Sequence, residues 1–285
     1  MALDEVVDGA VLKLKADLHW HTKDDPVDKD IIRYSTFEMI DRLHAKGINV
    51  FSITLHNKMH PPEEMKKIQD YAKKKGMIYI PGIERTIENA HVLIYNIHKE
   101  DAEKINTFID LSRTILDYGI RGLRKNLFIV AAHPFFPSKQ SIGNAFWRWH
   151  NLFHGLEYSA FYIKHSNFNR KAVLAAEIKD KVLVGGSDSH DFKRLGKTYS
   201  EIRMPSYALE FGKEYKPLKD IKEFKDYVKN CTDQEYDQLR EKIVYYMKEG
   251  RVHVKTKPLD MPYFIRYSIS TAKRLMMAAA KRFLQ

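Results

Sequence analysis

The 285-residue sequence contains only one cysteine, Cys231. A single thiol cannot form a disulfide within the chain, and it lacks the cysteine partners that a zinc knuckle requires. This absence excludes a small extracellular module held together by disulfides. It fits a protein that folds in a reducing compartment.

Long apolar runs are also missing from the sequence. No stretch reaches the roughly eighteen uninterrupted apolar residues that a membrane-spanning helix needs. The first twenty residues carry acids and lysines where a secretory signal would need an apolar block. There is no internal repeat, low-complexity tract or linker rich in Pro, Gly and Ser. The expected location is therefore the cytoplasm.

Acidic residues are outnumbered by basic ones. The chain has 48 Lys and Arg against 37 Asp and Glu, a formal net charge of +11. A positive field concentrates anionic partners, which include phosphorylated metabolites, nucleic acid and anionic lipid. The charge does not choose among them, because most of these lysines, such as Lys73, Lys74 and Lys75, are expected on the solvated faces of helices.

Short apolar runs typical of strands alternate with helical patterns along the first two hundred residues. Helices are expected over residues 35–46, 63–75 and 102–118. Strand–helix–strand spacing predicts a parallel sheet, and seven such units predict that the sheet closes into a barrel. The seven candidate strands cover residues 14–20, 49–56, 77–84, 90–97, 127–134, 154–160 and 181–190.

Candidate metal ligands gather at the ends of these strands. In α/β barrels the functional side chains lie at the carboxyl ends of the strands and in the loops that follow. His19 and His21 stand two residues apart, so a strand would point both imidazoles to the same side. Histidines and carboxylates end or border six of the seven strands: His19, His21, His56, Glu84, His91, His133, Asp188 and His190.

This set of side chains predicts a metal cluster. Imidazoles together with carboxylates suit Zn²⁺, Mn²⁺ or Fe²⁺ better than Ca²⁺ or Mg²⁺, which prefer oxygen ligands. There are more ligands than one tetrahedral site uses, so two or three ions are expected, with Glu84 placed to bridge them. Two neighbouring ions lower the pKa of bound water to about 7 and stabilise a leaving oxygen. The pattern therefore indicates a metal-dependent hydrolase.

Six short motifs resemble a known family. "DLHWHT", "ITLHN", "GIE", "AHVL", "AAHP" and "GSDSH" occur in the order of the successive motifs of the PHP (polymerase and histidinol phosphatase) domain. The resemblance covers residues 15–199. It implies a distorted seven-stranded TIM-like barrel whose trinuclear metal centre hydrolyses phosphoesters.

The resemblance also implies which residues hold the ions. Glu84 would bridge the first two ions, and Glu84 and Asp188 would be catalytic. Carried over by position, the ligands are His19, His21, Glu84 and Asp188 for one ion, Glu84, His91 and His133 for a second, and His56 and His190 for a third.

Two positions depart from the family pattern. An Asp that usually completes the third site is replaced by Pro26, and acids stand just before it at Asp24 and Asp25. Either acid is a candidate for the third site, and we include Asp25 among the expected ligands. Leu55 replaces the Asp of the family's "TDH", which is expected to remove a hydrogen bond to a ligand. His60 is an alternative ligand or a loop residue.

Three further residues lie beside these motifs. Arg85 directly follows Glu84, and its guanidinium is a candidate catalytic group that would grip a phosphate. The alternative is an ion pair with Glu88 or Glu157. Glu157 and Tyr158 end the sixth strand, and one of them is expected to contact the substrate or a ligand.

Residues 206–285 are expected to form a mainly helical extension of a barrel that covers residues 1–205. Helices are predicted over residues 217–230, 233–250 and 263–283. The last one is basic and amphipathic, so it would dock on the barrel or, alternatively, contact an anionic membrane or nucleic acid. Only about forty residues separate His91 from His133, so the mouth of the barrel is expected to be open.

Together these features predict a metal-dependent phosphoesterase in which a metal-bound hydroxide attacks phosphorus. The expected substrate is a small phosphomonoester or a nucleotide. Two alternatives stay open: a nuclease that acts on nucleic-acid ends, and a metal-binding regulatory protein without turnover. An aromatic and basic segment at residues 146–154 would stack bases in the nuclease, or form a buried helix face.

Overall fold

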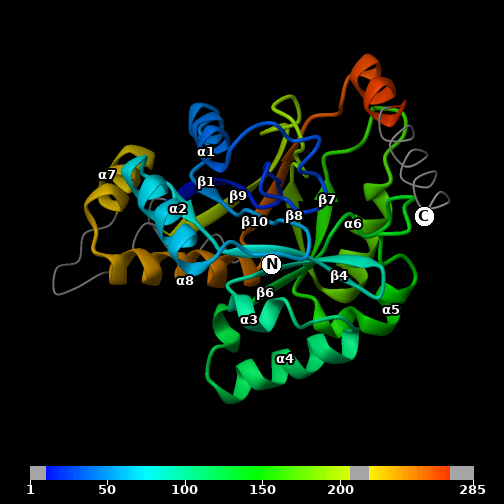
Figure 1. The fold of residues 1–285 in the computed structure, drawn as a ribbon, viewed down its shortest axis with the longest axis horizontal. Coiled ribbons are helices and arrows are strands. Elements are labelled where there is room, and N and C mark those ends of the chain that lie inside the picture. Colours follow the sequence, from blue (N-terminus) through cyan, green and yellow to red (C-terminus); the bar gives the residue numbers. More distant parts are fainter. Residues whose placement is uncertain (1–10, 206–217, 270–285) are drawn as a thin grey trace.

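The computed structural model describes residues 11–205 and 218–269, which form two five-stranded sheets with helices around them (Figure 1). Strands β1, β2 and β3 are parallel, β9 pairs antiparallel with β1, and β10 pairs antiparallel with β9. In spatial order, the first sheet contains β10 (Val252–Thr256), β9 (Thr198–Pro205), β1 (Val11–Asp17), β2 (Val50–Phe51) and β3 (Ile78–Tyr79).

The second sheet is also mixed. Strands β4 and β5 form a hairpin through Glu88 and Asn89, both with positive φ, and β6 runs antiparallel to β5. Strands β6, β7 and β8 are parallel. In spatial order the strands are β4 (Gly82–Ile87), β5 (Ala90–Tyr95), β6 (Phe128–Ala131), β7 (Gly155–Ser159) and β8 (Val182–Gly186).

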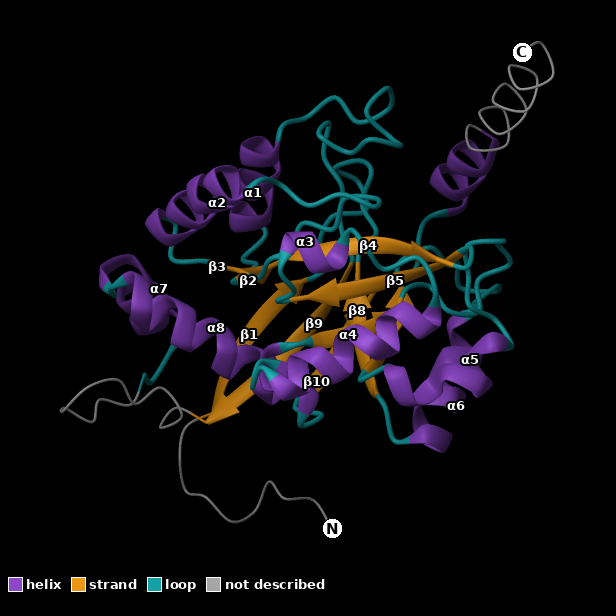
Figure 2. Ribbon diagram, turned by 60° about the horizontal axis from the view of Figure 1, so that its bottom comes forward, coloured by secondary structure: helices purple, strands orange, loops and turns teal. Residues whose placement is uncertain are grey.

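Helices surround the strands, which occupy the middle of the molecule (Figure 2). Residues 261–269 are helical as well, and short 3₁₀ turns lie at Arg124–Asn126 and His150–Leu152. The helices are α1 (Thr36–Ala45), α2 (Pro62–Lys74), α3 (Lys99–Ala102), α4 (Phe108–Ile120), α5 (Ala145–Trp149), α6 (Asn169–Lys179), α7 (Ile221–Asn230) and α8 (Asp233–Lys248). None of the helices in the described ranges is long and apolar enough to span a membrane.

The local sequence explains where several helices begin. Pro62 opens α2, where its missing N–H costs no helical hydrogen bond. Three other helices begin with a capping box, in which a hydroxyl and an acid three residues later satisfy each other's backbone N–H. These pairs are Ser35 and Glu38 at α1, Thr107 and Asp110 at α4, and Thr232 and Glu235 at α8.

The main core lies between the first sheet, the second sheet and helices α7 and α8. It contains Leu14 of β1, Val130 of β6 and Ile243 of α8, all fully buried. Burying one such side chain stabilises the fold by roughly 1.5–3 kcal/mol. A second core packs α4, α5 and α6 on the second sheet, and a third packs α1 and α2 around Trp20 and Phe51. The strands that carry the candidate ligands are therefore anchored on both faces.

The α/β class is confirmed, but the expected closed barrel does not form within the described residues. The two sheets meet through single bridges, Trp20 with Ser189 and His56 with Glu84. The predicted strand at 77–84 is interrupted by Pro81, which has no N–H to donate. Its first half becomes β3 in the first sheet. Its second half becomes β4 in the second sheet, where it pairs antiparallel with β5.

Other predicted elements also differ from those observed. The helix predicted at 102–118 is split, because α3 ends at Ala102 and α4 begins at Phe108. The predicted helices at 217–230 and 233–250 correspond to α7 and α8. The prediction missed β9 and β10, and β10 brings part of the C-terminal segment into the first sheet. The predicted helix at 263–283 is present over 261–269, and its remainder lies outside the described residues. The domain boundary at 205 stays a prediction.

Candidate metal centre

The eight histidines and carboxylates predicted from the strand ends meet at one place, around Glu84. This side chain is 1 % exposed and projects from β4. Its Oε1 lies 2.7 Å from Nδ1 of His91 and 3.3 Å from Nε2 of His133. Its Oε2 lies 3.1 Å from Nε2 of His56 and 3.4 Å from Nε2 of His21. One carboxylate therefore faces two groups of imidazoles, as a bridging ligand would.

His19 and His21 lie just beyond β1 and point to the same side, as predicted. Their Nε2 atoms are 3.3 Å apart, and Oδ1 of Asp188 lies 3.6 Å and 3.5 Å from them. Trp20, between them, points the other way into the core. His19, His21 and Asp188 thus form a group whose ligand atoms lie close enough to hold one ion.

Glu157 contacts two residues of the cluster, although it stands on β7. Its Oε1 lies 2.7 Å from Nδ1 of His19, and its Oε2 accepts a hydrogen bond of 2.7 Å from the backbone N–H of His133. A carboxylate that binds Nδ1–H leaves Nε2 free to bind a metal. Space for this contact comes from Gly186, where an added Cβ would clash with Glu157 and His19. The expectation that Glu157 or Tyr158 contacts a candidate ligand therefore matches the position of Glu157.

Asp25 lies against two histidines of the cluster. Its Oδ2 lies 2.8 Å from Nδ1 of His21 and 3.0 Å from Nδ1 of His56, and it accepts a hydrogen bond from the His56 N–H. The three ligand atoms are close enough to hold an ion, and the role of Asp25 as a ligand stays a prediction. Alternatively, with protons on both Nδ1 atoms, the carboxylate orients both rings. Asp24 points elsewhere, where its Oδ2 accepts a hydrogen bond from Thr36.

Asp28 also reaches the cluster, and the sequence analysis missed it. Its Oδ2 lies 2.9 Å from Nε2 of His190 and 3.7 Å from Nδ1 of His56. No motif signals this residue, because it lies in a loop whose path depends on the fold. The turn that delivers it is visible only in the structure, where Oδ1 of Asp25 accepts hydrogen bonds from the N–H groups of Val27 and Asp28.

Two cluster residues adopt left-handed backbone conformations just after strands. His133 has φ of 29° after β6, and Asp188 has φ of 43° after β8. Such conformations cost about 1–3 kcal/mol for a residue with a side chain, and they persist only where surrounding contacts hold them. At His133 those contacts include Glu157 and the Ser141 hydroxyl, which donates to the His133 carbonyl. These unfavourable conformations orient the His133 and Asp188 side chains toward the cluster.

Charges within the cluster depend strongly on one another. Burial raises the pKa of the Glu84 carboxyl, but the imidazoles of His91, His19 and His56 outweigh it, and this pKa falls well below its usual range. Burial opposes the charged form of His21 as well, but Asp188 and Asp25 raise the pKa of His21 to about 9. Without an ion, the carboxylates thus draw protons onto some imidazoles.

The donor set fits divalent transition metals. Oε2 of Glu84 is buried and accepts no hydrogen bond from any residue of the described ranges, although two Nε2 atoms lie nearby. Unpaired buried acceptors are costly, whereas a cation placed among them would satisfy several at once. Three overlapping groups meet the spacing for an ion: His19, His21 and Asp188; His21, Asp25 and His56; His56, Glu84 and His91.

Arg85 lies outside the cluster. It follows Glu84 on β4, so the two side chains point to opposite faces of the strand. Its guanidinium donates hydrogen bonds to the Ile105 carbonyl, Asn57 and Asn106, and its side chain is largely buried. These partners differ from the Glu88 or Glu157 ion pair considered from the sequence. A catalytic role for Arg85 stays a prediction.

Two other candidates also have partners of their own. His60 is buried, and its Nε2 lies 3.9 Å from Asp24 rather than near the cluster. Leu55 is buried in the core around α1 and α2. In the aromatic segment, Phe146 and Phe153 are buried against the second sheet, so a helix face is the better description of their spacing.

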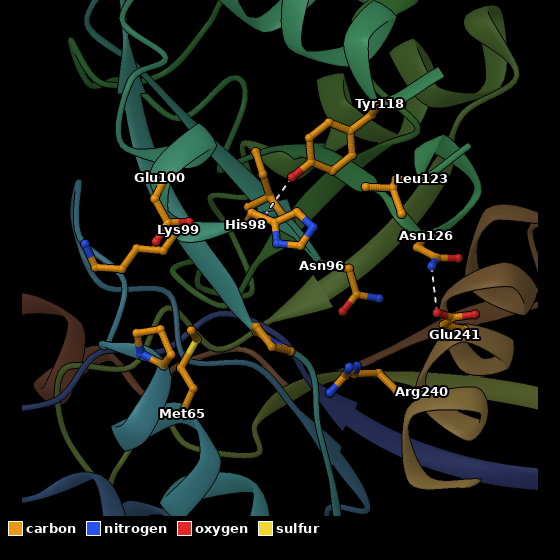
Figure 3. Close-up of a pocket in the computed structure, with 13 residues that line it drawn as sticks. Met65, Asn96, His98, Lys99, Glu100, Tyr118, Leu123, Asn126, Arg240 and Glu241 are labelled. Carbon is orange, nitrogen blue, oxygen red and sulfur yellow. Dashed lines mark hydrogen bonds between the residues drawn. The ribbon is translucent and has the colours of Figure 1, made fainter. Parts of the chain in front are cut away.

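A cavity of about 390 Å³ opens at a different set of residues (Figure 3). Met65 of α2, Asn96 after β5, Tyr118 of α4 and Arg240 of α8 contribute to its walls. No residue of the cluster lines it. We assign this cavity no part in the metal centre.

Comparisons with known proteins concern the fold. No protein-family model and no curated protein matches this sequence. The structure is similar to that of PsfC from Pseudomonas syringae PB-5123, with a TM-score of 0.52 and 16 % identity over 83 % of this chain and 99 % of that chain. At this identity the likeness is one of fold.

Two further solved structures are less similar, each with a TM-score of 0.42. One, from Bifidobacterium adolescentis, is described as a metal-dependent phosphoesterase and is 14 % identical over 62 % of this chain and 87 % of that chain. The other is an amidohydrolase from Chromobacterium violaceum, 15 % identical over 61 % of this chain and 87 % of that chain. The chain thus resembles the PHP family in its motifs and shares the fold of PsfC.

Proposed function

We propose that this protein is a metal-dependent phosphoesterase of the PHP type that hydrolyses a small phosphomonoester or a nucleotide. One observation carries the proposal: Oε2 of the buried Glu84 carboxylate faces Nε2 of His21 and of His56, and Oε1 faces Nδ1 of His91 and Nε2 of His133. Oε2 accepts no hydrogen bond from a described residue. Such an arrangement is costly for a structural core and suits a bridged metal cluster.

Two or three divalent ions of Zn, Mn or Fe fit this donor set. When bound, such ions lower the pKa of bound water to about 7 and stabilise the negative charge of a leaving oxygen. The proposed ligands are His19, His21, Glu84 and Asp188 for the first ion, Glu84, His91 and His133 for the second, and His56 and His190 with Asp25 or Asp28 for the third.

The other residues of the site hold these groups in place. Glu157 binds Nδ1 of His19, so Nε2 of His19 is directed into the cluster. Where Asp28 rather than Asp25 closes the third site, Asp25 does the same for His21 and His56. Asp188, whose side chain is 20 % exposed, lies nearer the solvent than Glu84. A phosphate would approach from that side, drawn by the net positive charge of the chain.

Metal content and phosphatase activity test the proposal together. The purified protein and the Asp188→Ala variant would be analysed for bound metal, then assayed on an aryl phosphate with and without added Mn²⁺. We expect two or three ions per chain in the wild type and a loss of turnover of at least a hundredfold in the variant. Asp24→Ala is the matched control, because Asp24 is an acid of the same region whose side chain is 41 % exposed.

The outcomes separate the candidate functions. Bound metal without turnover would contradict the phosphoesterase and favour the regulatory alternative. Hydrolysis of a 3′-phosphorylated nucleotide without phosphate loss from oligonucleotides would support a small substrate, and the reverse would favour the nuclease.

A further inference from the structure

A second cavity, of about 430 Å³, borders the metal centre. It lies between the loop that follows β8 and the helix at residues 261–269, which is the red helix of Figure 1. Its volume falls in the range of small-molecule pockets, about 300–1,000 Å³. The residues that line it are Asp191, Phe192, Lys193, Tyr263, Arg266 and Tyr267, and none of them belongs to the proposed ligand set.

Arg194 connects this cavity to the metal centre. The residue is 1 % exposed, and its Nη2 lies 2.9 Å from Nδ1 of the proposed ligand His190. The same Nη2 donates a hydrogen bond of 3.0 Å to the hydroxyl of Tyr267, over whose ring the guanidinium lies at 4.4 Å. One buried side chain therefore contacts both a proposed ligand and a residue that lines the cavity.

The cavity is basic. Its acid, Asp191, is already engaged: Oδ1 accepts hydrogen bonds from the N–H groups of Lys193 and Arg194, and Oδ2 accepts one from the Tyr263 hydroxyl. Lys193 and Arg266 are exposed, and neither forms an ion pair with any residue in the described part of the chain. Two cations against one carboxylate leave the lining of the cavity with a net positive charge.

The remaining walls are flat and apolar. The rings of Tyr263 and Tyr267 stack at 6.0 Å, and Nζ of Lys193 lies 5.9 Å from the centre of the Tyr263 ring. Phe264, on the same helix, stacks on Phe161 of the loop after β7, and this contact holds the helix in place beside the cavity. Aromatic walls with cations at the rim suit an organic group that carries a negative charge.

We propose that this cavity binds a second anionic group, a carboxylate or a phosphate, carried by the leaving group of the substrate. Lys193 and Arg266 supply the positive charge, and Tyr263 and Tyr267 pack against the organic part. The inference rests on the proposed phosphoesterase function and narrows its substrates to phosphomonoesters that carry a second negative charge.

Three aryl phosphates with one common ring test the inference. Phenyl phosphate has no second anion, 4-carboxyphenyl phosphate has a carboxylate, and benzene-1,4-diyl bisphosphate has a phosphate. For the metal-loaded wild type we expect kcat/KM to be about tenfold higher for one or both anionic substrates, beyond the statistical factor of about two for the bisphosphate. The difference should lie mainly in KM. A higher kcat/KM for 4-carboxyphenyl phosphate would indicate recognition of a carboxylate, and a higher kcat/KM for the bisphosphate would indicate recognition of a phosphate.

Variants of the two exposed cations locate the effect. Lys193→Ala and Arg266→Ala should each reduce, several-fold, the ratio of kcat/KM for the anionic substrates to kcat/KM for phenyl phosphate, whereas Arg266→Lys should retain most of that ratio. Lys222→Ala, an exposed lysine of α7, is the control for a simple change in net charge. Because Lys193 and Arg266 are exposed, their truncation should leave the thermal unfolding temperature close to that of the wild type.

Failure of the inference and failure of the proposed function look different. Equal kcat/KM for the three substrates in the wild type, or an undiminished preference in both alanine variants, would overturn the cavity assignment and leave the phosphoesterase intact. If the wild type hydrolyses none of them, the proposed function is wrong. Calorimetric titration with 4-carboxyphenyl phosphate against phenyl phosphate then tests the cavity alone, and equal binding would overturn it.

Discussion

Oε1 of Glu157 lies 2.7 Å from Nδ1 of His19, and neither side chain is exposed to solvent. The two residues are 138 positions apart in the chain, so the contact exists only because β7 and the end of β1 converge. In the neutral imidazole, which is the form that binds a metal, this contact places the proton on Nδ1. The Nε2 lone pair is thereby directed toward Glu84 and Asp188.

Replacing this carboxylate with an amide should weaken metal binding. In Glu157→Gln the single oxygen can accept a hydrogen bond from His19 or from the His133 N–H, but not from both, and the amide nitrogen would face the other donor. We expect metal affinity to fall about 10–100-fold without loss of the fold, as judged by metal titration and circular dichroism. Glu177→Gln, an exposed acid of α6, is the control. An unchanged affinity would show that His19 needs no such support.

Asp28 should contribute to binding of an ion at His190, whereas Asp24 should not. Burial raises the pKa of the Asp28 carboxyl, but its hydrogen bond to His190 outweighs this and lowers that pKa below its usual value. Asp28→Asn keeps the size and removes the charge, so we expect at least a tenfold loss in affinity for one ion, seen by titration and elemental analysis. Asp24→Asn should behave as the wild type. Equal effects of the two variants would argue against a third site closed by Asp28.

His154 should make stability depend on pH, independently of the metal centre. Its Nδ1 accepts a hydrogen bond from the Ile129 N–H, and burial, aided by nearby cations, lowers its pKa to about 3. In the unfolded chain the His154 imidazole binds a proton as the pH falls through about 6.5, whereas in the folded chain it stays neutral there. The stabilisation is complete above that pH and is lost progressively as the pH falls toward 3.

The test of this prediction is the pH dependence of unfolding by urea. Between pH 7 and pH 5 the wild type should lose about 1–2 kcal/mol more than His154→Asn. Asparagine can still accept the Ile129 hydrogen bond but does not titrate, so the difference isolates the imidazole. Parallel pH profiles for the two proteins would contradict the assigned pKa.

The candidate site was predictable from the sequence to the extent that its residues stand next to strand ends. His19 and His21 share a face because they are two residues apart just beyond β1, and His133 and Asp188 each lie just after a strand. His56 follows β2 at a greater distance and pairs through a single bridge to Glu84. These relations depend on local geometry, which a sequence pattern records. Glu84 was expected at a strand end but lies inside β4, because Pro81 shifts the strand boundary.

Other features depend on contacts between distant segments, and no local pattern records them. Asp28 reaches His190 across 162 positions, and Arg194 reaches Tyr267 across 73. Strand β10 reads as part of a helical region, and only its pairing with β9 makes it a strand. The barrel prediction failed for a related reason, because alternating strands and helices do not specify the antiparallel return of β5 against β4.

The sparse backbone pairing between the two sheets has a mechanical consequence. The two sheets pack on the shared main core, but within the described residues the backbone bridges between them are Trp20–Ser189 and His56–Glu84, and the proposed ligands stand at or beside both. The two sheets also supply different ligands: His19, His21 and His56 follow strands of the first, while Glu84, His91 and His133 belong to or follow strands of the second. Ions bound among them would therefore cross-link the two sheets, so metal binding would also stabilise the packing of one sheet against the other.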